Sequence, residues 1–475
     1  MKVLIISTNR HPLPVPVMPI GACIVAEAAE SAGHTVKVVD LMFKKNPLQS
    51  VELALDDIKP DVIGLSVRNI DNNDMQNPVF FVKDLIPLVE TVRRKSEATI
   101  ILGGSAASVM PEELMRYTGI SCAVLGDGEV VFPELLRRLS NGGNVKEAPG
   151  VALIDGHEFV SHPRLSGGPS HECIVPDFAR WIDVREYLSQ LSTVPLQTKL
   201  GCHFKCIYCT YRKIEGNTYR LFDPEGITEL IKRLASSGLR DIEFVDNVFN
   251  SPYYHAAALC ENLARERVRV RLYSLELNPL LIDDTLITVM ERAGFRSIGI
   301  TVESASDEVL HGLRKGYTAG DVHRAAQVVR NHKLPCVWIF MLGGPCETEA
   351  TVRKTLRFAE KFIRPHDTAF FGIGVRVYPG TELETIARQQ GVLSLSSEEM
   401  FTPVFYVSPE IDSKWMSQQI TYSVNNHMNF ISSVSIGLSF LPSLHRLAHR
   451  LGIKPPLWKY TRFIRRGLRF AGIDA

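Results

Sequence analysis

The sequence lacks several features that would place the chain in a specialised class. No apolar run approaches the roughly 20 residues of a membrane span; the nearest, residues 428–441, is shorter and holds four serines. A general nucleic-acid binder would show a basic excess, whereas 53 basic and 52 acidic residues leave a net charge of +1. Nine cysteines are an odd number for a secreted disulfide framework, and the short apolar start resembles no signal peptide. We therefore expect a cytoplasmic protein.

The composition that remains is ordinary for a globular chain. The 475 residues are 45% hydrophobic and 22% charged, and this length suggests two to four domains. Continuous apolar strands separated by segments of helical spacing predict an α/β domain with a parallel, doubly wound sheet. Ligands bind such sheets beyond the carboxyl ends of the strands. The predicted strands are residues 3–7, 36–40, 62–66, 99–102 and 122–125.

A second alternating series follows the first domain. A hairpin over residues 150–160, turning at Asp155-Gly156, ends that domain. We divide the chain into a first domain (1–165), a linker (166–190), a second α/β domain (191–395) and a mainly helical C-terminal region (396–475). Six strand–helix units in the second domain predict a partial (β/α)6 barrel with its chemistry at the strand carboxyl ends. The predicted strands are residues 195–198, 242–245, 270–274, 297–302, 337–342 and 369–377.

Three cysteines lie on one loop directly after the first strand of this second series. Cys202, Cys206 and Cys209 have the spacing CxxxCxxC, and soft thiolates select zinc, copper(I) or an iron–sulfur cluster. Structural zinc requires a fourth ligand, but no second CxxC follows, and His203 would have to fold back beside its neighbour. Three thiolates on a cubane leave one iron open. The pattern therefore favours a [4Fe-4S] cluster, with zinc as the alternative.

This cysteine motif, with an aromatic residue before its last cysteine, resembles the signature of radical S-adenosylmethionine (SAM) enzymes. Four further segments resemble the strand motifs of that family, in the family's order: residues 242–247, 299–304, 340–345 and 376–381. The resemblance covers about 190 residues. It implies that the cysteines bind the cluster and that SAM contacts Tyr208, Asp246, Asn247, Glu303, Ser304, Gly343, Gly344 and Tyr378. From the residues alone, Tyr208 is open to a packing role, and Glu303 and Ser304 are open to a role as polar residues of the barrel interior.

The first domain resembles the cobalamin-binding domain of one subgroup of this family. The matching segments are 19–21, 28–40, 103–104 and 126–129. Each is weak alone, because such turns are common, but their order and their strand-end positions agree. The resemblance implies that cobalamin contacts Pro19, Gly21, Ser66, Arg68, Asn69, Gly103, Gly104, Gly126, Asp127, Gly128 and Glu129.

One absence concerns the lower face of the cobalamin. The sequence has no Asp-x-His-x-x-Gly motif, so no histidine is evident to coordinate cobalt from below. Arg68 follows the third strand at the corresponding place, and a guanidinium cannot donate a lone pair to a metal. The resemblance implies that Arg68 lies under the corrin and keeps cobalt at low coordination. The alternative is a salt bridge from Arg68 to Asp71 or Asp74.

The C-terminal tail is the one basic segment of the chain. Residues 444–475 contain eight basic residues against one acid, with large apolar residues interleaved. A basic amphipathic helix can lie on a membrane surface or bind an anion. Packing against the barrel with its charges in solvent is the interpretation we favour, and peripheral membrane contact is the alternative.

The resemblance implies a cobalamin-dependent radical SAM enzyme that methylates an unactivated carbon of a small molecule. One SAM would methylate cobalamin, and a second would yield the radical that removes a substrate hydrogen. The alternatives are radical cyclisation or rearrangement, methylation of an sp2 carbon without that radical, and a sensor that binds both cofactors without turnover. Methylthiotransferases carry three more N-terminal cysteines, whereas this domain has only Cys23 and Cys122. The expected partners are a small-molecule substrate and an electron donor such as flavodoxin or ferredoxin, with no nucleic acid.

Overall fold

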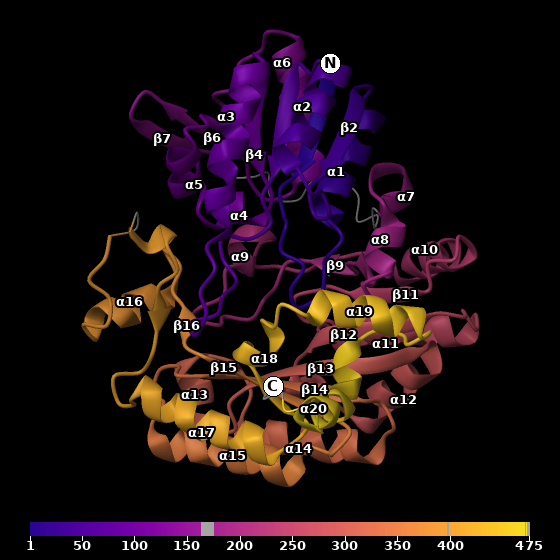
Figure 1. Cartoon of the computed structure of the whole chain (residues 1–475), viewed down its shortest axis with the longest axis vertical. Coiled ribbons are helices and arrows are strands. Elements are labelled where there is room, and N and C mark those ends of the chain that lie inside the picture. Colours follow the sequence, from indigo (N-terminus) through magenta and orange to yellow (C-terminus); the bar gives the residue numbers. More distant parts are fainter. Residues whose placement is uncertain (163–174, 397–398, 471, 473–475) are drawn as a thin grey trace.

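The computed structural model describes residues 1–162, 175–396, 399–470 and 472. The N-terminal domain is built on one seven-stranded sheet of order β2-β1-β3-β4-β5-β6-β7, at the top of Figure 1. Strands β1 to β5 pair in parallel, and β6 and β7 add an antiparallel hairpin at one edge. The strands are β1 (Lys2–Ser7), β2 (Thr35–Asp40), β3 (Val62–Ser66), β4 (Thr99–Gly103), β5 (Cys122–Val124), β6 (Val151–Asp155) and β7 (Glu158–Ser161).

Helices cover both faces of this sheet, as the buried apolar strands require. Helices α1 and α6 pack together, and so do α2 and α3, so the predicted doubly wound domain is confirmed. The helical segment before β4 begins with a short 3-10 turn, η1, and continues as α3. The helices are α1 (Ile20–Ser31), α2 (Pro47–Ile58), η1 (Phe81–Asp84), α3 (Leu85–Lys95), α4 (Ser105–Val109), α5 (Pro111–Thr118) and α6 (Gly128–Ser140).

The linker predicted for 166–190 is described only in part, because residues 163–174 lie outside the described residues. Its later part forms two short helices, α7 (Phe178–Trp181) and α8 (Val184–Leu188). The Trp181 indole donates to Glu27 of α1 at 2.7 Å, and the Tyr187 hydroxyl donates to Asp40 of β2 at 2.7 Å. These contacts hold this part of the chain against the N-terminal domain.

The second domain is a partial barrel with a sheet of order β18-β15-β14-β13-β12-β11-β8, all pairs parallel. Five predicted strands recur with shifted ends. The sixth stops at residue 373, because Gly374 has a φ of +77°. A seventh strand, which the sequence analysis missed, comes from the C-terminal region. The strands are β8 (Val194–Leu196), β11 (Asp241–Phe244), β12 (Arg271–Leu277), β13 (Phe295–Glu303), β14 (Cys336–Leu342), β15 (Thr368–Ile373) and β18 (Phe430–Ser432).

Helices cover the outer face of the barrel sheet. The capping of α10 illustrates the local logic: Pro224 occupies its first turn, and the Asp223 side chain accepts the Gly226 amide at 2.8 Å. The helices are α10 (Pro224–Ser236), α11 (Tyr253–Arg265), η2 (Pro279–Leu281), α12 (Asp284–Ala293), α13 (Asp307–Gly312), α14 (Ala319–Asn331), α15 (Glu349–Phe362) and α16 (Glu382–Gln389).

The C-terminal region is mainly helical, as expected, and returns to the barrel through β18. Two-stranded pairs, β9 (Lys199–Leu200) with β10 (Arg220–Leu221) and β16 (Val375–Arg376) with β17 (Phe405–Tyr406), lie outside the main sheets. No helix among the described residues is long and apolar enough to cross a membrane. The remaining helices are α9 (Tyr211–Ile214), η3 (Glu399–Phe401), α17 (Ser413–Asn426), α18 (Ser433–Ile436), α19 (Leu441–Arg450), η4 (Leu457–Tyr460) and α20 (Thr461–Phe470).

The carboxyl ends of the two main sheets face each other. The loop after β3 reaches the barrel, where Met75 lies against Gly374 at the end of β15 and Gln76 donates to Ser417 of α17 at 3.0 Å. Helix α4 of the N-terminal domain contacts α9, which follows the cysteine loop. In Figure 1, α4 and α9 lie between the upper domain and the barrel. Both sets of predicted ligand loops therefore lie at one interface between the domains.

Candidate functional site

The three-cysteine loop runs from β9 to α9, above the end of the first barrel strand. Gly201 has a φ of +85°, and a side chain there would place its Cβ 2.0 Å from the Thr218 carbonyl oxygen. Glycine is therefore required for the close approach of the loop to residues 216–218. The Cys202 amide donates to the Gly216 carbonyl at 3.2 Å, and the Ile207 amide donates to Leu313 at 3.3 Å. These bonds fix the loop at both ends.

The cysteine side chains are available as ligands. All three are free of disulfides, and burial raises the pKa of Cys202 and raises that of Cys209 to about 12. Buried thiolates therefore need a metal to stabilise their charge. In a cubane, each of the three cysteines would ligate a different iron.

A buried charge cluster lies beside this loop. The Tyr208 hydroxyl donates to Glu303 Oε1 at 2.7 Å, and Lys315 Nζ lies 3.0 Å from both groups. Burial raises the pKa of Tyr208, and the Glu303 carboxylate beside it adds to this. Glu303 ends β13 with a φ of +61°, a conformation uncommon for a side chain of this size. Tyr208 and Glu303 thus act as a unit, and Lys315, which no sequence motif marked, completes it.

Asp246 and Asn247, two of the residues expected to contact SAM, have different roles. Asp246 is buried, and its carboxylate accepts the Thr198 amide at 2.8 Å, the Thr198 hydroxyl at 2.9 Å and the Lys199 amide at 3.2 Å. Asp246 therefore holds the end of β8 to β11. Asn247 donates to Glu215 at 2.6 Å, but its buried Oδ1 finds no partner among the described residues. An orphaned buried acceptor of this kind suits a ligand's donor group.

The other predicted SAM residues are spread over several environments. Ser304 is fully buried and bonds Thr355 of α15 at 3.1 Å, so its hydroxyl is taken up behind the strand. Gly343 has a φ of +99°, and a Cβ on Gly344 would lie 3.0 Å from Leu313; both form a tight turn after β14. The Tyr378 hydroxyl donates to Asn73 of the N-terminal domain at 2.9 Å. The structure thus brings Tyr208 and Glu303 together and directs Ser304 and Tyr378 elsewhere.

The predicted cobalamin residues gather at the carboxyl ends of β1, β3, β4 and β5. A Cβ on Gly21 or Gly103 would meet no atom within 4 Å, so their backbones face open space. At Gly104, φ is +90° and a Cβ would lie 2.4 Å from the Val67 carbonyl oxygen. Ser66 ends β3, and Pro19 caps α1. Glycine backbone beside open space is the environment that a large planar ligand requires.

The Gly126–Glu129 turn also makes contacts within the protein. Its first amide donates to Ser108 Oγ at 2.9 Å, and a Cβ on Gly128 would lie 2.9 Å from Val25 of α1. Asp127 forms a bidentate pair with Arg220 of the barrel domain, at 2.6 and 2.8 Å. Burial raises the pKa of Glu129. The Asp127 carboxylate therefore ties the two domains together.

Arg68 and Asn69 are exposed side chains within the interface between the domains. The Arg68 guanidinium lies near Tyr211 of α9; partial desolvation lowers the pKa of Arg68, and Tyr211 opposes this shift. Asp71 is paired with Arg376 at 2.9 Å, and Asp74 accepts the Gln76 amide at 3.0 Å. Both alternative partners of Arg68 are therefore engaged elsewhere.

A second acidic side chain, Glu276, lies near Glu303 in the barrel. Glu276, on β12, has a pKa raised to about 7 by burial and by the neighbouring Glu303 carboxylate. Burial raises the pKa of Tyr211, and the nearby Glu276 carboxylate adds to this. Tyr211 thus lies near both Arg68 of the N-terminal domain and Glu276 of the barrel. No short motif marks Tyr211 or Glu276 in the sequence.

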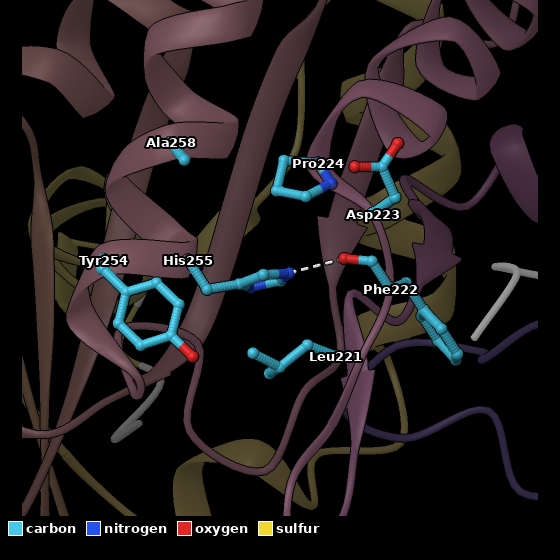
Figure 2. Close-up of a pocket in the computed structure, with 7 residues that line it drawn as sticks. All are labelled: Leu221, Phe222, Asp223, Pro224, Tyr254, His255 and Ala258. Atoms are coloured by element: carbon cyan, nitrogen blue, oxygen red, sulfur yellow. Dashed lines mark hydrogen bonds between the residues drawn. The ribbon is translucent and has the colours of Figure 1, made fainter.

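A small cavity of about 320 Å³ lies apart from this interface, where α10 and α11 begin. His255 Nε2 bonds the Phe222 carbonyl at 2.7 Å, as the dashed line in Figure 2 shows. The remaining lining is Leu221, Asp223, Pro224, Tyr254 and Ala258. None of the predicted cofactor residues lines this cavity, so it plays no part in the site described above.

Comparison with known protein families agrees with this arrangement. Residues 8–136 match the B12 binding domain, and residues 197–359 match the Radical SAM superfamily. The chain belongs to the cobalamin-dependent radical SAM enzymes. Its cofactors are a [4Fe-4S] cluster, SAM and cobalamin, and the orphaned Asn247 acceptor, the buried thiols and the open glycine edges are compatible with them.

Individual relatives add detail about what the chain is similar to. It is 27% identical to a hopanoid C-3 methylase of Methylococcus capsulatus, over 66% of this chain and 58% of that protein. It is 24% identical to a tryptophan 2-C-methyltransferase of Streptomyces laurentii, over 79% of this chain and 73% of that one. The solved structure of the methyltransferase TsrM of Kitasatospora setae, with cobalamin and a [4Fe-4S] cluster bound, covers 99% of both chains with a TM-score of 0.84 and 23% identity.

Proposed function

We propose that this enzyme transfers the methyl group of SAM to a carbon atom of a small molecule by way of cobalamin. The observation that carries the proposal is the meeting of the two cofactor-binding edges at one interface, where α4 of the N-terminal domain contacts α9, which follows the cysteine loop. A substrate at this interface would lie between the two cofactor loops. The names of both similar methyltransferases support the same reaction class.

The cluster loop and its neighbours would bind SAM at the barrel. Cys202, Cys206 and Cys209 would hold three irons, and the bound cluster supplies one-electron reduction of SAM. Asn247 would accept a hydrogen bond from SAM through its free Oδ1. Lys315 would fix Tyr208 and Glu303 as a rigid wall, since one ammonium contacts both side chains. Such preorganisation reduces the ordering cost of binding.

Arg68 would lie against the lower face of the cobalamin. The bound corrin would supply a methyl carrier, and a protonated guanidinium has no lone pair with which to ligate its metal. Electron paramagnetic resonance of the cob(II)alamin state should therefore show no nitrogen splitting from an axial base, and Arg68→His should introduce it. A triplet nitrogen splitting in the unmodified enzyme would refute this role and direct attention to His11, in the loop after β1; His34, at the opposite edge of the sheet, contacts the Met1 amino group.

The reaction class can be tested before the substrate is known. Reconstituted enzyme, a flavodoxin or ferredoxin system as the proposed electron donor, and SAM are incubated without oxygen with a metabolite extract. Methyl transfer predicts a product heavier by one CH2 group, whereas the second candidate, cyclisation, predicts a product lighter by two hydrogens. The second candidate rests on the similarity to an anaerobic magnesium-protoporphyrin IX monomethyl ester cyclase of Rubrivivax gelatinosus, at 23% identity.

A further inference from the structure

Helices α19 and α20 each have one face packed against the protein and another face exposed to solvent. Helix α20 is buried against the protein through Thr461 and Arg465. The Arg465 guanidinium donates to the Val424 carbonyl at 2.9 Å and to that of His427 at 2.8 Å, so it satisfies the end of α17. Arg469 adds a bond to the Asn425 carbonyl at 2.7 Å. These contacts make α20 a docked helix, as the sequence analysis favoured.

The opposite face of α20 is apolar and lies in solvent. Phe463 is 72% exposed and Phe470 is 96% exposed. The two residues are seven apart, so they project from the same side of the helix, with Gly467 between them. Arg462 and Arg466, one turn apart, are also exposed and flank this side. Docking onto the barrel therefore does not explain the two phenylalanines.

Helix α19 repeats the arrangement. His445 and Ala448 are buried, whereas Leu447 is 53% exposed and Leu451, one turn later, is 71% exposed. Basic side chains again adjoin the apolar ones. The two helices and the segment between them share a small apolar cluster with Leu191, which precedes β8; the other members are Leu444, Ala448, Ile453, Leu457, Tyr460 and Ile464. The two exposed faces therefore belong to one module, residues 441–470.

Charge distinguishes this module from the rest of the chain. It holds eight basic residues and no acidic one, while the whole chain has a net charge of only +1. Large exposed apolar side chains beside lysine and arginine are the features of a helix that lies in the interface of an anionic membrane. A nucleic acid would be attracted by the same charge, but it gives Leu447 and Leu451 no apolar partner.

We propose that the C-terminal module docks the enzyme on an anionic lipid surface, with Phe463, Phe470, Leu447 and Leu451 entering the lipid and the basic side chains contacting phosphate headgroups. This docking goes beyond the proposed methyl transfer and does not depend on it. The membrane contact treated as the alternative in the sequence analysis is thus compatible with the packing that was favoured, because different faces of α20 serve the two.

The experiment uses the full chain and sedimentation with vesicles of phosphatidylcholine, with or without phosphatidylglycerol, at physiological ionic strength. The intact protein should bind the mixed vesicles and bind pure phosphatidylcholine weakly. Phe463→Ser with Phe470→Ser should weaken binding on the order of tenfold. Arg462→Glu with Arg466→Glu should weaken it by more than about fivefold per site.

Matched controls remove equally exposed groups from other helices. Tyr254→Ser deletes an aromatic side chain that is 68% exposed on α11, and Arg233→Glu reverses an exposed charge on α10. Both should leave vesicle binding and cobalamin binding unchanged. The proposal is overturned if the intact protein shows no preference for anionic vesicles, or if the controls weaken binding as much as the test variants do. It is also overturned if the arginine variants lose binding to duplex DNA or transfer RNA while vesicle binding is unaffected.

Discussion

The ion pair between Asp71 and Arg376 joins the two domains inside the interface. Asp71 lies in the loop after β3, and Arg376 lies on β16, 305 positions later in the chain. Arg376 Nε is 2.9 Å from Asp71 Oδ2, and the two side chains are 3% and 0% exposed. Removing one partner of such a pair leaves a buried charge without compensation, which costs about 3–5 kcal/mol. We therefore expect Asp71→Ala alone and Arg376→Met alone each to destabilise the cofactor-free chain by about that amount.

The double variant separates this pair from general damage to the interface. Asp71→Ala with Arg376→Met removes both charges, so its loss of unfolding free energy should be well below the sum of the two single losses. The coupling energy should reach about 3 kcal/mol. Guanidinium unfolding, followed by circular dichroism, measures all four proteins. The pair Arg116–Glu112 on α5, at 2.7 Å with side chains 38% and 43% exposed, serves as the matched control, and its coupling should not exceed about 0.5 kcal/mol.

The same cycle has a result that would refute the reasoning. If the two single losses at the buried pair simply add, the pair carries no more energy than the exposed control, and the charges do not hold the domains together. Because the loop of Asp71 also carries Arg68, each single variant should in addition weaken hydroxocobalamin binding. Equilibrium dialysis tests this without any need for turnover.

Three further predictions concern the cofactors and the pH dependence of stability. Cys206→Ala should abolish the visible absorption of the cluster, whereas Cys346→Ala, at an exposed cysteine, should leave it intact; a full cluster in the former would contradict the assignment. Gly103→Ala should preserve stability but weaken cobalamin binding, because the added methyl group fills only open space. Gly104→Ala should instead destabilise the apo fold by about 1–3 kcal/mol. Equal behaviour of the two variants would be inconsistent with a ligand beside Gly103. Burial raises the pKa of Glu347 to about 7, so the folded chain binds this proton more tightly than the unfolded chain does. The stabilisation that this proton gives is fully present below pH 4.5 and is lost as the pH rises through the folded-state pKa of about 7. Glu347→Gln should flatten that decline in urea titrations, and an unchanged slope would argue against the shift.

Much of the fold follows from local sequence patterns. The apolar strand segments 62–66 and 337–342 recur within one residue, because their ends are marked by turn residues. The cysteine loop is equally local. Strand β18 was missed because its three residues form a strand only through the free edge of β15. A segment that short in a helical region has no periodicity to recognise.

The side-chain roles were harder to predict, because they depend on partners far apart in the chain. Asp127 lies in a predicted cobalamin turn, but it pairs with Arg220, 93 positions away. Lys315 meets Tyr208 across 107 positions. Strand motifs also leave orientation open, and so Ser304 faces α15 while its neighbour Glu303 faces the cysteine loop.

The central claim is that a methyl group passes from SAM to cobalamin at the interface between the two domains. The direct measurement incubates the reconstituted, reduced enzyme with SAM that carries a deuterated methyl group, without any substrate, and extracts the cobalamin for mass spectrometry. The account predicts cobalamin that carries the deuterated methyl group in the intact protein. Cobalamin that stays unmethylated while deoxyadenosine accumulates would contradict it.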